Sequence, residues 1–177
     1  MKNILFIYGT RPEAIKLFPL ISEAKKELSS NIFVLCTGQH QSLKEFYEIF
    51  DIYPDHSIDL KRKSGSLSEL SSLLIDEIDK IILNFKPDLV FVHGDTSSSF
   101  IGSLCAFYNK IDIAHVEAGL RTHNILSPFP EEANRVFISN IAKYNFCPTE
   151  LSKQNLLDEG IEEDKIYVVG NTVIDSV

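Results

Sequence analysis

Three carboxylates of this 177-residue chain occupy positions that are typical of catalytic acids and bases. Asp95 and Glu117 each follow a strongly apolar run, and Glu131 begins a helical pattern introduced by SPFP at 127–130. Carboxylates crowded in a partly dry cleft acquire different pKa values, so that one holds a proton while another accepts one. If the three side chains meet, they are equipped for acid–base chemistry.

Structural roles are the alternative for these residues. Asp95 precedes Thr96 and would cap a helix that starts there, and Glu131 would stabilise a helix start through the helix dipole. Spacing alone does not choose between these roles and catalysis. We predict structural rather than catalytic roles for the histidines near the same strand ends, because His93 and His115 lie within or beside apolar runs. We expect both rings to pack in the core.

The first turn, GTRPE at 9–13, is a candidate anion site. A helix start there offers backbone amides and the helix dipole, and Arg11 adds a guanidinium beside them. The alternative is that Arg11 pairs with a neighbouring carboxylate.

Motifs for the common cofactors are missing from the sequence. Gly9 stands alone after the first apolar run, so the G-x-G-x-x-G fingerprint of dinucleotide binding is not formed. The sequence also has no P-loop, no G-x-S-x-G elbow and no His/Cys cluster at zinc spacing. Binding of a nicotinamide or flavin cofactor is therefore disfavoured.

The elements that must position these residues alternate between strands and helices. Short apolar runs predict strands at 4–8, 32–36, 89–93, 111–116, 144–147 and 166–169, with a weaker one near 57–60. Their continuous hydrophobicity indicates a parallel sheet that is buried on both faces. We therefore predict an α/β fold, a Rossmann-like parallel sheet with helices on both faces, in one domain over 1–177. Ligands of such sheets bind beyond the carboxyl ends of the strands, where the polar tracts lie.

Helix signals fill the gaps between the strands. They predict helices from Pro12, from the capping box at 66–69 to Lys86, from 96 to 109, from Pro130, and from 149 to 160.

Composition narrows the class of protein. Lys and Arg number 17 against 25 Asp and Glu, a formal charge of −8 that argues against a nucleic-acid partner. No apolar run approaches the roughly 18 residues of a membrane span, so we expect no membrane partner. Three widely spaced cysteines are expected to be reduced core thiols, which favours a cytoplasmic location.

The tracts after the strands resemble, in order, those of the non-hydrolysing UDP-N-acetylglucosamine 2-epimerases. The similar tracts are GTRPE (9–13), TGQH (37–40), HGDT (93–96), HVEAGLRT (115–122), SPFPEEANR (127–135) and GNTVID (170–175). The resemblance implies interconversion of UDP-N-acetylglucosamine and UDP-N-acetylmannosamine for surface polysaccharide synthesis. UDP is eliminated to give 2-acetamidoglucal and is then added back with the opposite configuration at C2, without cofactor or metal.

The same resemblance implies an architecture. The family has the two-domain fold of B-type glycosyltransferases, and this chain is similar to the N-terminal half. Residues from about 170 would begin the link to a C-terminal domain that is missing here and that carries the family's catalytic histidine. We therefore expect the fragment alone to be inactive, and a homodimer through this domain is implied.

Individual residues take roles from the resemblance. Asp95 and Glu131 are expected to transfer protons, and Glu117 to orient groups or stabilise charge. Arg11 and Lys16 correspond to positions at the nucleotide end of the substrate. Arg135 corresponds to a position beside the sugar and the carboxylates. Gln39 and His40 correspond to a tract that, in some members, binds a second, activating molecule of UDP-N-acetylglucosamine. The residues around that tract diverge here, so activation is left open.

Two other classes of function remain open from the sequence. The same fold serves hydrolysing epimerases and glycosyltransferases, although the first turn and the Pro-Glu-Glu run fit the hydrolysing epimerases less well. A non-catalytic module that binds a nucleotide sugar is the other alternative.

Overall fold

The computed structural model describes residues 1–27, 29–38, 44–172 and 174, and in them one seven-stranded sheet forms. The strand order is β3-β2-β1-β4-β5-β6-β7, and every neighbouring pair is parallel. The strands are β1 (Asn3–Tyr8), β2 (Asn31–Cys36), β3 (His56–Ser57), β4 (Leu89–His93), β5 (Asp112–Val116), β6 (Tyr144–Cys147) and β7 (Ile166–Val168). The predicted Rossmann-like parallel sheet is confirmed.

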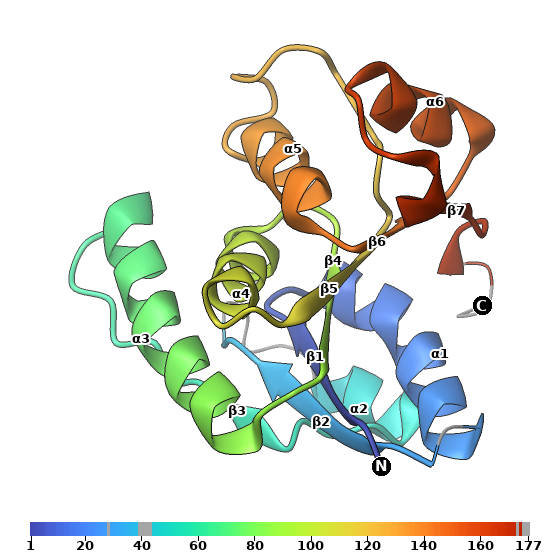
Figure 1. The fold of residues 1–177 in the computed structure, drawn as a ribbon. Coiled ribbons are helices and arrows are strands. Elements are labelled where there is room, and N and C mark those ends of the chain that lie inside the picture. Colours follow the sequence, from blue (N-terminus) through green and yellow to red (C-terminus); the bar gives the residue numbers. More distant parts are fainter. Residues whose placement is uncertain (28, 39–43, 173, 175–177) are drawn as a thin grey trace.

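Helices cover both faces of this sheet, as Figure 1 shows. The helices are α1 (Arg11–Glu27), α2 (Lys44–Phe50), α3 (Leu67–Phe85), α4 (Ser97–Tyr108), α5 (Glu131–Ile141) and α6 (Glu150–Asp158), followed by a short 3-10 helix, η1 (Glu163–Lys165). α3, α4 and α5 pack on one face, while α1 and α2 pack on the other. α6 packs at the β6–β7 edge.

The chain order of the strands explains this layout. β1 lies in the middle of the sheet, and the chain first adds β2 and β3 on one side before it crosses to β4 on the other. Parallel neighbours require right-handed crossovers, so the two directions of growth place their helices on opposite faces. The order reverses between β1 and β4, so the loops after these strands form a crevice at the carboxyl edge.

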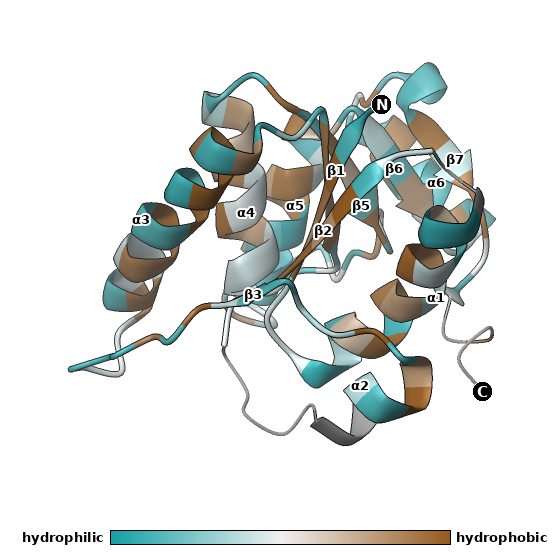
Figure 2. Cartoon of the chain, turned by 90° about the horizontal axis from the view of Figure 1, so that it is seen from below, coloured by the Kyte–Doolittle hydropathy of each residue, from teal (hydrophilic) through white to brown (hydrophobic). Residues whose placement is uncertain are grey.

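Alternating side chains of the central strand feed two separate cores. Leu5 and Ile7 face the α3 and α4 side, and Phe6 and Tyr8 face α1. The strands and the inward sides of the helices are correspondingly apolar, with polar residues on the outer sides (Figure 2). The prediction of core thiols is also confirmed, since all three cysteines are buried and unpaired.

Helix caps largely match the sequence signals. The side chains of Ser66, Thr96 and Thr149 accept backbone N–H bonds at the starts of α3, α4 and α6. The capping box of α3 forms only by half, because the Glu69 carboxylate accepts from the amides of Lys63 and Ser64 instead of that of Ser66. The loop before the helix is thereby tied to its first turn.

The edge of the sheet beside β2 differs from the prediction. The weak strand expected at 57–60 is β3 at His56–Ser57, since only these residues pair with Leu35 and Cys36. Ile58 instead joins the core under α3. Helix α2 was not predicted from the sequence at all.

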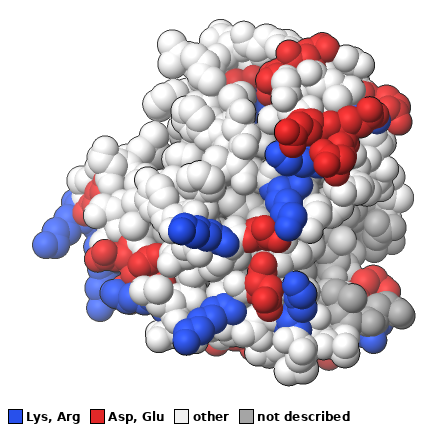
Figure 3. All heavy atoms as spheres, in the orientation of Figure 1, with Lys and Arg blue, Asp and Glu red and all other residues white. Residues whose placement is uncertain are grey.

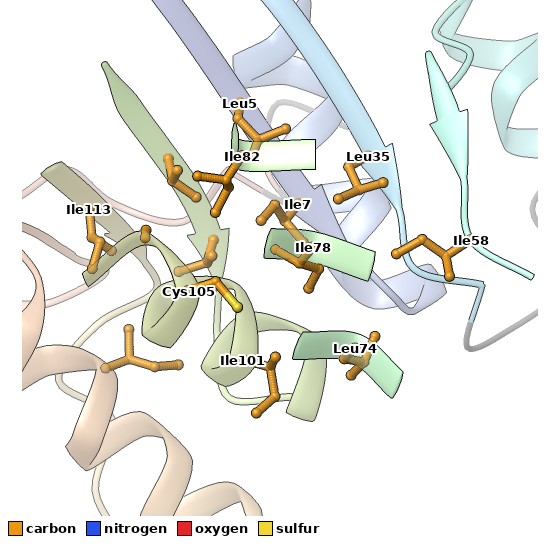
Figure 4. Close-up of a cluster of buried hydrophobic side chains, with 14 of the residues drawn as sticks. Leu5, Ile7, Leu35, Ile58, Leu74, Ile78, Ile82, Ile101, Cys105 and Ile113 are labelled. Atoms are coloured by element: carbon orange, nitrogen blue, oxygen red, sulfur yellow. The ribbon is translucent and has the colours of Figure 1, made fainter. Parts of the chain in front are cut away.

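A substitution at Leu74 of α3 tests how well the core between the sheet and α3 and α4 is packed. Figure 4 shows this core in close-up. The side chain is fully buried among residues of the sheet and α4. We expect Leu74→Ala to lower the free energy of unfolding by about 2–5 kcal/mol, because it leaves a cavity. Leu83→Ala on the same helix is the control, since Leu83 is 56% exposed. Urea denaturation followed by circular dichroism measures both, and equal losses would contradict the packing described.

Candidate active site

The sheet brings the three predicted carboxylates to one place. β4 and β5 are neighbours, with His93 paired to Val116, so the loops carrying Asp95 and Glu117 leave the sheet side by side. Asp95 interacts electrostatically with both Glu117 and Glu131. Residues that are far apart in the sequence therefore form an acidic cluster at the carboxyl edge, although Glu131 and Glu117 line different cavities.

Asp95 is held by helix α5. Its Oδ2 accepts a 2.5 Å hydrogen bond from Arg135 Nη2, and its backbone carbonyl accepts from Asn134 Nδ2 at 2.8 Å. Burial raises the pKa of Asp95, and Glu131 and Glu117 add to this, while Arg135 opposes it. The alternative that Asp95 caps α4 is wrong, because Thr96 caps that helix with its own hydroxyl.

Glu117 has the opposite electrostatic character. It pairs with Lys16 of α1, and His93 Nε2 lies 3.7 Å from the same carboxylate oxygen. Burial raises the pKa of Glu117, but His93 and Lys16 outweigh burial and lower it to about 2. The backbone φ of 63° is uncommon outside glycine and is frequent at functional sites. The environment of Glu117 therefore favours its ionised form, whereas burial shifts the pKa of Asp95 in the opposite direction.

Glu131 begins α5 beside an open groove. The groove has a volume of about 590 Å³. Its lining includes Glu131 with Thr10, Thr96, Ser97, Pro130 and Arg62. Acidic side chains gather over α6 at the upper right of Figure 3, while basic and acidic side chains lie next to one another below them. A net acidic protein thus offers local cations to an anionic ligand.

Glu13 occupies part of the predicted anion site. Its buried carboxylate accepts from the amides of Gly9 and Thr10 at 3.0 and 2.7 Å, so these two amides do not receive an external anion. The other oxygen accepts from the hydroxyls of Thr96 and Ser99 at 2.7 and 2.8 Å. Glu13 thereby joins the turns before α1 and α4. The T-x-x-E spacing at 10–13 is a capping-box signal from which half of this arrangement was predictable.

Arg135 and Glu132 fix the loop that follows Glu117. Glu132 is buried, and its Oε1 accepts from the amides of Thr122 and His123. Arg135 Nη1 lies 3.6 Å from Glu132 Oε2, so the guanidinium bridges Glu132 and Asp95. The resemblance to the family implied a position for Arg135 near the carboxylates, but the sequence analysis did not identify the role of Glu132.

His115 fulfils the structural role predicted for it. Its Nε2 lies 2.7 Å from the carbonyl oxygen of Gly94, the residue before Asp95. Complete burial lowers the pKa of His115 to about 4, and the bond to Gly94 opposes this only in part. The neutral ring therefore anchors the Asp95 loop.

Lowering the pH should destabilise the folded chain, because the native state disfavours protonation of His115. Between pH 6.5 and 4 the unfolded state binds a proton at this ring that the native state does not, so stability falls as the pH falls. A pKa fall from 6.5 to about 4 corresponds to about 3 kcal/mol. His115→Gln should flatten this part of the stability curve, measured by urea denaturation at each pH, whereas His123→Gln, at an exposed position, should not. An unchanged slope in His115→Gln would contradict the assignment.

The remaining predicted residues are placed as follows. Arg11 is exposed at the first residue of α1, and Lys16 lies one turn further along, against Glu117. Gln39 and His40 lie outside the described residues. None of the helices in the described ranges has the length and hydrophobicity of a membrane span.

Fold and site together define the class of protein: a Rossmann-like domain with an acidic cluster at the carboxyl edge of its sheet. Residues 22–177 match the family model described as UDP-N-acetylglucosamine 2-epimerase. The chain belongs to this family.

Individual relatives agree with the family match. The chain is 46% identical to the UDP-N-acetylglucosamine 2-epimerase of Neisseria meningitidis over 176 residues, which are 99% of this chain and 47% of that protein. It is 44% identical to the enzyme of that name from Salmonella typhimurium, with the same coverage. The chain thus spans about half the length of the curated relatives it matches.

Solved structures extend the comparison to the fold. A crystal structure of the Neisseria meningitidis enzyme bound to UDP-GlcNAc superposes with a TM-score of 0.95 at 46% identity, over 98% of this chain and 47% of that one. MurG from Acinetobacter baumannii is 12% identical and has a TM-score of 0.70 over 97% of this chain and 46% of its own. At that identity the likeness to MurG shows the fold alone.

Proposed function

We propose that this chain is the N-terminal domain of an enzyme that interconverts UDP-N-acetylglucosamine and UDP-N-acetylmannosamine. The observation that carries the proposal is the acidic cluster, in which burial raises the pKa of Asp95 while His93 and Lys16 hold Glu117 ionised against its burial. The named relatives and the UDP-GlcNAc complex of one of them support this choice of substrate.

The proposed chemistry is elimination followed by addition. A carboxylate removes the proton from C2 while the C1–O bond to UDP breaks, which gives UDP and 2-acetamidoglucal; re-addition with protonation on the other face inverts C2. No carbonyl acidifies the C2 hydrogen, so positive charge develops at C1 as the diphosphate leaves. Asp95 and Glu131 transfer the protons, and the ionised Glu117 stabilises that charge or orients its neighbours.

Cations around the cluster complete the site. Arg11 and Lys16 meet the nucleotide end of the substrate, and Arg135 holds Asp95 beside the sugar. The uridine and diphosphate contacts supplied by a C-terminal domain would be absent from this chain, so the domain alone would be inactive. A cytoplasmic enzyme, a homodimer through this domain and a second ligand near Gln39 and His40 belong to the same proposal.

The decisive experiment uses the complete protein that contains this chain. UDP-N-acetylglucosamine is supplied in D₂O, and products are separated by anion exchange and examined by NMR. We expect UDP-N-acetylmannosamine with deuterium at C2 and no net release of UDP. Free N-acetylmannosamine with UDP would indicate a hydrolysing enzyme, and sugar on an added acceptor a transferase. Binding without any turnover would leave a nucleotide-sugar-binding module.

A further inference from the structure

His93 acts electrostatically on Glu117, but its buried ring nitrogen makes no hydrogen bond in the described residues. The side chain is 5% exposed at the end of β4, and Nε2 has no hydrogen-bond partner among the residues that the structure describes. A buried polar atom left unpaired is costly, so such an atom in a native structure calls for an explanation.

One group lies just out of reach of this nitrogen. Nε2 is 3.7 Å from Glu117 Oε2, and the same oxygen is the one that pairs with Lys16. The other ionisable groups that interact with the ring are Asp95 and His115. A small cavity of about 10 Å³ is lined by both His93 and Glu117.

Lys16 and His93, the two groups beside Glu117, differ in whether a bound diphosphate could reach them. Lys16 is 21% exposed and is a cation that an incoming diphosphate attracts, whereas His93 is enclosed. If Lys16 turned to the diphosphate with nothing in its place, Glu117 would become a partly buried charge without a partner, which is strongly unfavourable. A hydrogen bond from the imidazole N–H to the carboxylate would replace the lost pair.

We propose that Glu117 exchanges partners, pairing with Lys16 in the free protein and with His93 when a nucleoside diphosphate engages Lys16. His93 is then a positioning residue that acts through Glu117 and has no contact with the substrate. This inference rests on the proposed function, because it requires Lys16 to meet the diphosphate.

UDP binding to the complete protein, measured by isothermal titration calorimetry, tests the exchange. We expect His93→Phe, which has no donor, to weaken UDP binding about tenfold or more, since hydrogen bonds to charged groups are the strong ones. His93→Gln should retain most of the affinity, because its amide can donate to Glu117. In a Glu117→Gln background, His93→Phe should have little further effect. His56→Phe, at an exposed position on β3, is the control for a histidine replacement.

The outcomes separate this inference from the proposed function. Failure of the unaltered protein to bind UDP would remove the proposed function and the exchange with it. UDP binding that is equal in the unaltered protein and His93→Phe would overturn the exchange alone, as would a loss that persists in the Glu117→Gln background. Thermal unfolding checks that each variant folds. If His93→Phe does not fold, the ¹⁵N shift of His93 Nε2 in the unaltered protein decides: we expect it to change on adding UDP, and an unchanged shift would overturn the exchange.

Discussion

Asp95→Asn in the complete protein is expected to lower the rate of epimerisation by about a thousandfold, which lies within the usual range for loss of an acid–base group. The asparagine keeps the shape of the side chain and a carbonyl oxygen for Arg135, but it cannot accept and return a proton. UDP binding and the melting temperature should change little. Initial rates of UDP-N-acetylmannosamine formation measure the effect.

Asp112→Asn is the matched control for this prediction. Asp112 is a partly exposed residue at the opposite end of β5, where it pairs with Lys143. An exposed ion pair of this kind contributes little, so neither rate nor stability should change measurably. If Asp95→Asn retained the rate of the Asp112→Asn control, Asp95 would be a structural residue and the proton-transfer assignment would pass to Glu131 alone.

Glu13→Ala is expected to lower the free energy of unfolding by at least about 3 kcal/mol, because each buried donor left unsatisfied costs about 1–3 kcal/mol. Three donors lose the carboxylate that they meet at 3.0, 2.7 and 2.7 Å: the amides of Gly9 and Thr10 and the hydroxyl of Thr96. The hydroxyl of Ser99 keeps an acceptor, because it also lies 2.6 Å from the carbonyl oxygen of His93. The effect should exceed that of Leu74→Ala at the lower end of its range. Urea denaturation of the chain, followed by circular dichroism, measures it.

Glu23→Ala on the same helix separates this effect from a general loss of charge. Glu23 is exposed and pairs only with the exposed Lys26 among the contacts seen in the described residues, so its removal should cost less than about 0.5 kcal/mol. Losses of similar size in the two variants would show that Glu13 does not join the two turns. Enzymatic rates of Glu13→Ala are uninformative if the domain unfolds, so stability is the measured quantity.

Local patterns in the sequence were sufficient for most of the fold. Six of the strands follow apolar runs, although Tyr167 and Val168 of the edge strand β7 are exposed. The starts of α3, α4 and α6 follow hydroxyl caps that act within four residues. β3 and α2 are short elements with weak local signals. β3 is defined by its pairing to the end of β2, which is a contact between distant parts of the chain.

The sequence by itself determined that Asp95 and Glu117 follow strands and that Glu131 starts a helix, because hydrophobic runs and helix signals are local. Only the tertiary structure decided what these carboxylates touch. Lys16 meets Glu117 across 101 residues and Glu13 meets Thr96 across 83, through strand order that no local pattern encodes. The charge state of each carboxylate follows from those contacts and from burial, so the division of labour within the site belongs to the folded chain.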